Sequence, residues 1–150
     1  MPDLAVLIGR ADPLVLTELM RHRVPHLAVL AEEAIGVVGP LVEPGHTPCL
    51  RCLDLSKAAR DPAWPRILAQ VSGPVAASAA ALACDTALAA ATAALATAQA
   101  LMLIDRAGEP ATANGTLELV LPDWQWHRRG WPAHPACTCR ATDAASQSRR

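Results

Sequence analysis

The chain begins with two short apolar runs on either side of a more polar stretch. Residues 4–8 and 26–30 contain almost no polar side chains, which is typical of strands buried on both faces of a parallel sheet. Between them, Asp12 and Pro13 suit the N-cap and the first position of a helix that would end near residue 22. The pattern predicts one right-handed βαβ unit with parallel strands.

The first of these strands lies almost at residue 1, although a buried parallel strand normally has neighbours on both sides. We therefore expect the later part of a doubly wound domain, whose first half is absent or supplied by another chain. The sequence contains no Gly-x-Gly-x-x-Gly, so this type of phosphate-binding loop is not predicted.

The next segments are less regular. Residues 34–42 predict a third strand that ends in the turn residues Gly39 and Pro40, and residues 44–48 form a loop before Cys49. Residues 53–70 are charged and broken by prolines, so we expect one or two short helical turns on the surface, anchored by Trp64.

An alanine-rich stretch predicts a long helix. Residues 76–100 contain fifteen alanines, and leucines flank a narrow polar stripe. We expect a largely buried helix with that stripe facing solvent, in preference to a membrane span. Cys84 is expected to be a small buried side chain. The stripe consists of Ser78, Asp85, Thr92, Gln99 and Arg106.

The last third predicts a hairpin and a tail. Residues 116–121 and 124–128 alternate between apolar and polar positions, and Pro122 and Asp123 lie between them as a turn. We expect one domain over residues 1–140 and a disordered polar tail over residues 141–150.

Length and charge limit the classes of function. A chain of 150 residues that is 52% hydrophobic suits one domain with a core of its own. Thirteen Lys and Arg against 14 Asp and Glu leave no basic field for nucleic acid, although Arg128 and Arg129 lie among tryptophans. No secretory signal is visible, so a reducing cytoplasm is expected.

In that compartment, paired cysteines indicate a metal more often than a disulfide. Cys49 and Cys52 form a Cys-x-x-Cys pair, and Cys137 and Cys139 form a tighter Cys-x-Cys pair. Four thiolates would hold a structural zinc ion with no open position for a substrate. Two alternatives stay open, namely a site that includes His134 and thiols or disulfides without metal.

Other candidate residues are weaker. Asp12 follows the first strand, where open α/β sheets bind ligands, so it could hold magnesium or a nucleotide, but an N-cap role accounts for it fully and is favoured. The remaining histidines form no catalytic arrangement by spacing, and no catalytic residue is predicted. They are His22, His26, His46 and His127.

The order of these parts and four local sequences carry a family resemblance. Residues 37–45 (VVGPLVEPG) and 49–55 (CLRCLDL) precede the alanine-rich helix, the hairpin and the second cysteine pair. This order resembles the later portion of the ThiF/MoeB/HesA family, the ubiquitin-activating-enzyme-like adenylyltransferases. Residues 60–65 (RDPAWP) and 131–139 (WPAHPACTC) more closely resemble the bacterial branch associated with peptide-modifying cyclodehydratases.

The resemblance implies a partial Rossmann-like, ThiF-type α/β fold whose sheet is parallel and whose C-terminal hairpin is closed by zinc. It implies that the four paired cysteines are the zinc ligands and that Asp12 matches the aspartate that helps to hold magnesium-ATP. The implied partners are the leader of a ribosomally made precursor peptide, a modifying enzyme or a second copy of the chain, without nucleic acid or membrane.

Departures from the family bear on catalysis. Pro13 follows Asp12 where active members carry asparagine, and the glycine-rich nucleotide loop has no counterpart in this sequence. We therefore expect a zinc-containing module for ribosomal peptide modification that does not catalyse alone. The alternatives are a truncated ATP-dependent adenylyltransferase and a zinc-stabilised interaction domain.

Overall fold

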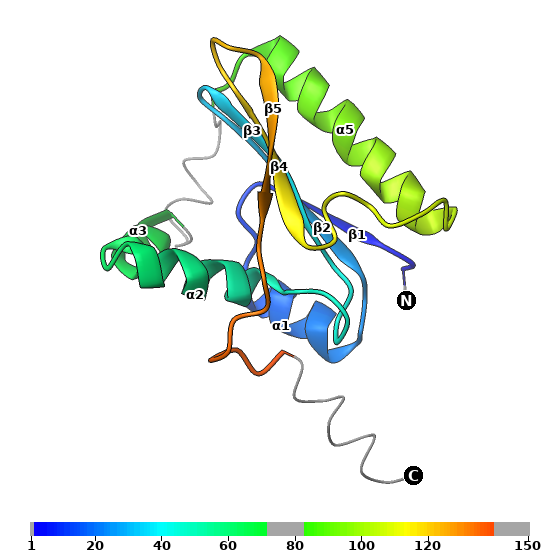
Figure 1. Ribbon diagram of the computed structural model, residues 1–150, viewed down its shortest axis with the longest axis vertical. Coiled ribbons are helices and arrows are strands. Elements are labelled where there is room, and N and C mark those ends of the chain that lie inside the picture. Colours follow the sequence, from blue (N-terminus) through cyan, green and yellow to red (C-terminus); the bar gives the residue numbers. More distant parts are fainter. Residues whose placement is uncertain (1, 72–82, 140–150) are drawn as a thin grey trace, which may run out of the picture.

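A five-stranded sheet in the order β1-β2-β3-β4-β5 is the centre of the protein. The structure is a computed structural model that describes residues 2–71 and 83–139. Figure 1 shows α5 along one side of this sheet, and α2 and α3 on the other. The strands are β1 (Ala5–Ile8), β2 (His26–Glu32), β3 (Ile35–Val42), β4 (Gly115–Val120) and β5 (Gln125–Gly130); the helices are α1 (Pro13–Arg21), α2 (Leu50–Arg60), α3 (Trp64–Val71) and α5 (Thr86–Ile104).

The predicted βαβ unit is confirmed. The β1 and β2 strands pair in parallel, and α1 connects them. The Asp12 carboxylate accepts a hydrogen bond from the Leu14 amide at 2.7 Å, so it caps α1 as the sequence indicated, and Pro13 occupies the first turn.

The expected parallel sheet is wrong beyond this pair. The β2–β3, β3–β4 and β4–β5 pairs are all antiparallel. Only Glu33 and Ala34 separate β2 from β3, and Glu33 has a φ of 50°. A connection of this length closes a hairpin, because a parallel crossover needs a dozen or more residues. The fold is therefore a mixed α/β sheet.

The β1 strand also differs from its prediction. It was expected to be buried on both faces, but it lies at the edge of the sheet with Val6 48% and Ile8 85% exposed. Both residues pair with β2 residues that α5 covers, and α5 makes its main contacts with β2 and β3. An apolar face of the strand is therefore open in this structure.

The two residues of the predicted polar stripe that lie within α5 are on the opposite face from the one expected. Thr92 and Gln99 are buried against the sheet, whereas Leu101 and Ile104 are exposed. The Thr92 hydroxyl donates to the Leu88 carbonyl at 2.7 Å. The Gln99 side-chain oxygen accepts hydrogen bonds from the amide and hydroxyl of Thr112. These bonds satisfy the polar groups without water, so burial is tolerated.

The helix begins later than predicted. Asp85 is its N-cap and Arg106 follows its end, while Ser78 lies outside the described residues. Cys84 is half-buried just before the helix, and its backbone forms an isolated parallel β-bridge with that of Glu33. The polar tail over residues 141–150 also lies outside the described residues.

Apolar contacts between α5 and the sheet form the main core. The core consists of Leu27, Val29, Val38, Leu41 and Ala96, with Leu117 packed against it. Among the described helices, α5 alone is long and apolar enough to cross a membrane by length and composition. One face of α5 packs on β2 and β3, but only 28% of its apolar window is buried, so the expectation of a largely buried helix is wrong.

Candidate metal centre

A hydrogen-bonded loop after β3 leads to the first cysteine pair, Cys49 and Cys52. The Thr47 hydroxyl donates to the Leu41 carbonyl and accepts from the Glu43 amide, and the Thr47 amide donates to the Glu43 carbonyl. These bonds fix the approach to α2. Cys49 is then the N-cap of α2 and Cys52 lies in its first turn, so the helix holds both sulfurs on one side.

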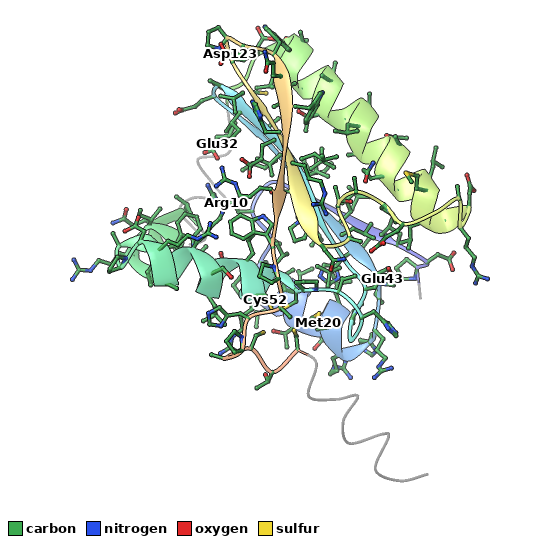
Figure 2. The ribbon with its side chains drawn as sticks, viewed as in Figure 1. Arg10, Met20, Glu32, Glu43, Cys52 and Asp123 are labelled. Carbon is green, nitrogen blue, oxygen red and sulfur yellow. The ribbon has the colours of Figure 1, made fainter. Side chains whose placement is uncertain are left out.

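The second pair arrives from the segment that follows β5. Trp131 anchors this segment, because its indole N–H donates to the Thr116 hydroxyl at 3.0 Å and its amide donates to the Asn114 carbonyl. The Cys137 amide donates to the His134 carbonyl at 2.9 Å, which forms a turn. Figure 2 shows Cys52 and Met20 close together where this segment reaches α1 and α2.

The four sulfurs lie within 4.8 Å of one another. The Sγ atoms of Cys49 and Cys137 are 3.6 Å apart, those of Cys52 and Cys139 are 3.5 Å apart, and those of Cys49 and Cys52 are 3.9 Å apart. A zinc ion bonded to four tetrahedral thiolates at about 2.3 Å requires sulfurs about 3.8 Å apart. The donor set therefore fits a metal ion such as zinc, and all four cysteines are free thiols.

The surroundings give the thiols different acidities. Burial raises the pKa of Cys49 far above its ordinary value and that of Cys139 to about 11. Burial acts in the same direction on Cys52, but hydrogen bonds from the backbone at His134 and Cys49 outweigh it and lower its pKa. Metal binding to these thiols must therefore release protons, since a metal binds the thiolate form.

Apolar contacts close the site. Val42 and Met20 pack against the cysteine cluster, and Cys49 and Cys52 are buried. Four protein thiolates would leave no coordination position for a substrate, so a metal here would serve the structure. It would join α2 to the segment after β5.

The other candidate residues lie apart from this cluster. Among the described residues, His134 does not belong to the group of possible metal ligands. The Nδ1 atom of His134 accepts a hydrogen bond from the Ala136 amide. Asp12 lies exposed at the start of α1, so its role toward a nucleotide stays a prediction. The tryptophans near Arg129 form no single patch, because Trp131 is buried while Trp126 is exposed.

A second cluster was missed from the sequence. Lys57, Arg60 and Arg129 surround the buried Trp131 ring, although α2 and β5 are far apart along the chain. The only local signal was the spacing of Lys57 and Arg60, which puts both on one face of a helix.

Comparison with known proteins finds similar structures only. No protein-family model and no curated protein matches the sequence. The structure of E. coli MccB with ATP matches with a TM-score of 0.64 and 20% identity, covering 91% of this chain and 39% of that one. The chain shares its fold with part of MccB.

Two further structures agree. The microcin C7 biosynthetic enzyme MccB in complex with N-formylated MccA matches with a TM-score of 0.66 and 21% identity, over 92% of this chain and 41% of that one. A heterocyclase in complex with substrate and cofactor matches with a TM-score of 0.66 and 18% identity, over 91% of this chain and 20% of that one.

These identities establish similarity of fold alone. The shared fold agrees with the family expected from the sequence, and the cyclodehydratase-associated branch stays a prediction. The chain spans about two fifths of the length of MccB, so the activity of whole MccB does not transfer with the fold.

Proposed function

We propose that this chain is a zinc-containing ThiF-like module that binds the leader of a precursor peptide and acts with a peptide-modifying enzyme in the cytoplasm. The observation that carries the proposal is the fold shared with MccB and a heterocyclase, both seen with peptide or substrate bound. In this proposal Cys49, Cys52, Cys137 and Cys139 hold the zinc, which keeps the C-terminal segment on α2.

A binding measurement tests this function. Isothermal titration of the zinc-loaded protein with the leader of a precursor peptide encoded beside its gene should give a saturable heat, and a scrambled leader should give none. Equal heats from both peptides would refute leader recognition and favour a general interaction domain.

A second candidate is an ATP-dependent adenylyltransferase that works with a further segment or chain. It is favoured by the MccB structures that contain ATP or AMPCPP and by the position of Asp12 after β1. Its test is release of pyrophosphate from ATP and magnesium in the presence of the same peptide. Release that Asp12→Asn abolishes would establish this candidate.

A further inference from the structure

The indole ring of Trp131 is buried between α2 and the hairpin of β4 and β5. Only 4% of this residue is exposed, and hydrogen bonds to Thr116 and Asn114 hold it from both its ring and its backbone. Figure 2 shows Arg10 near Glu32, on the side of the sheet that carries α2.

Cations converge on this ring. The Lys57 ammonium lies 6.0 Å from the Trp131 ring centre and 4.4 Å from that of Trp64. The guanidinium carbons of Arg60 and Arg129 lie 5.4 and 5.9 Å from the Trp131 ring centre. Two of these cations come from one face of α2 and the third comes from β5.

The neighbouring carboxylates are already engaged. The Glu118 carboxylate accepts two hydrogen bonds of 3.1 and 3.2 Å from the Arg129 guanidinium. Glu32 pairs with Arg10 at 3.4 Å. Asp54 accepts the indole N–H of Trp64 at 3.2 Å, and burial raises its pKa.

Lys57 and Arg60 differ from the other two cations. Over residues 2–71 and 83–139, neither has a hydrogen bond or ion pair to a carboxylate, and their partners are aromatic rings. Burial lowers the pKa of Lys57, so its ammonium has lost part of its water. The charges of Asp54 and Glu118 offset this effect only in part. A partly desolvated cation with no carboxylate hydrogen-bonded to it is stabilised further by an anion.

We propose that Lys57 and Arg60, which lie over the ring of Trp131, bind one carboxylate of an acidic peptide. This inference rests on the proposed function, since it assigns part of the peptide surface. The four cations, counting Arg10, and the three carboxylates Glu32, Asp54 and Glu118 sum to a charge of +1, while the Asp61 carboxylate next to Arg60 accepts the Ala63 amide. That charge matches one carboxylate, whereas a doubly charged phosphate would face Asp54 and Glu118 with excess negative charge.

The test follows the indole N–H signals of Trp64 and Trp131 by NMR in the zinc-loaded full chain. The probes are a short capped peptide that contains aspartate, its copy with asparagine, and inorganic phosphate. We expect the aspartate peptide to shift both signals saturably, with affinity at least about tenfold higher than that of the asparagine copy or of phosphate.

Variants locate the effect. The Lys57→Met/Arg60→Met protein should lose the shift, while Arg66→Met, an exposed arginine of α3, should keep it. Each single methionine variant provides a second reading if the double variant does not fold. No saturable shift, tighter binding of phosphate, or equal binding by folded methionine variants would overturn the inference.

The result is separable from leader binding. If the leader binds equally to wild type and to the methionine variants, the carboxylate site is refuted and the proposed function stands. If the leader does not bind at all, the proposed function fails and the aspartate peptide still decides this site.

Discussion

At the scale of single residues, His26 links stability to pH. Its side chain is 1% exposed, and Nδ1 lies 3.0 Å from the Val24 carbonyl, to which it donates in the neutral ring. Burial lowers the pKa of His26, and the backbone hydrogen bond opposes this only in part. The folded protein therefore holds this ring neutral where the unfolded chain would already bind a proton.

The sign of the effect follows from this difference. Because the unfolded state binds more protons, the free energy of unfolding should fall as pH drops below the ordinary histidine value of about 6.5. His26→Asn keeps a donor near Nδ1 and removes the titration. Between pH 7.5 and 5.5, urea denaturation should show a smaller loss of unfolding free energy in this variant than in wild type. Equal losses in the two proteins would contradict a role for His26.

At the scale of elements, the contact between α5 and β3 depends on one glycine. A Cβ at Gly36 would collide with the Thr92 hydroxyl and would lie 3.3 Å from a Leu88 methyl group. This close approach is what allows the polar Thr92 to be buried against the strand.

We expect Gly36→Ala to lower the free energy of unfolding by about 1–3 kcal/mol, since overpacking a core costs this much. Thr92→Ala removes the obstructing hydroxyl. The Leu88 carbonyl, which accepts from that hydroxyl, lies within the same helix and is not left as an unpaired acceptor. The double variant should regain most of the loss in urea denaturation. Additive losses would show that the two residues do not collide.

The same helix shows where sequence patterns fail. Features that depend only on neighbouring residues could be predicted from the sequence. They are the helix cap at Asp12 and Pro13 and the close pair formed by Cys49 and Cys52. The side on which Thr92 and Gln99 lie depends on Gly36 and Thr112, which are distant along the chain. A polar stripe of this kind is read as solvent-facing unless those partners are known.

The sheet shows a related limit. An apolar run predicts a strand, but it does not give the direction of the neighbouring strands, and here the short Glu33–Ala34 connection decided it. The approach of α2 to Trp131 had no signal in the sequence beyond the spacing on one helix face. Contacts of this kind are set by the assembled fold.

At the scale of the whole molecule, the cysteine cluster joins distant parts of the chain. We expect about one equivalent of zinc by elemental analysis, and loss of stability when a chelator removes it. Apparent zinc affinities of small domains correspond to about 10–16 kcal/mol of folding free energy. Thermal unfolding of Cys49→Ser should begin well below that of wild type.

A matched control lies in the same chain. Cys84 is a half-buried thiol outside the cluster, so Cys84→Ser should retain both the zinc content and the unfolding temperature. Less than half an equivalent of zinc in freshly reduced wild type would refute a zinc site. Equal unfolding of the two serine variants would show that the cluster does not stabilise the fold.

The two edges of the sheet differ in character. The β5 strand carries His127, Arg128 and Arg129, whereas β1 carries no charge and leaves Ile8 exposed. Charged edges resist pairing with other strands, and apolar edges favour it. The β1 edge is therefore the side from which we expect self-association.

We predict that Ile8→Lys lowers the association measured by sedimentation velocity at high micromolar concentration. Ile104→Lys is the control, because Ile104 is also exposed but lies on α5. If Ile104→Lys alone reduces association, the face of α5 and not the sheet edge is the contact.

The separation of the two cysteine pairs has a consequence during synthesis. Cys49 and Cys137 are 88 residues apart, which a ribosome needs roughly 5–20 seconds to translate. For that interval the first pair leaves the ribosome without its partners and is open to oxidation or to incomplete metal binding. A metal ion bound by all four thiols could complete this fold only after Cys139 has been translated. The yield of folded protein should therefore depend on the redox state and zinc supply of the cell that makes it.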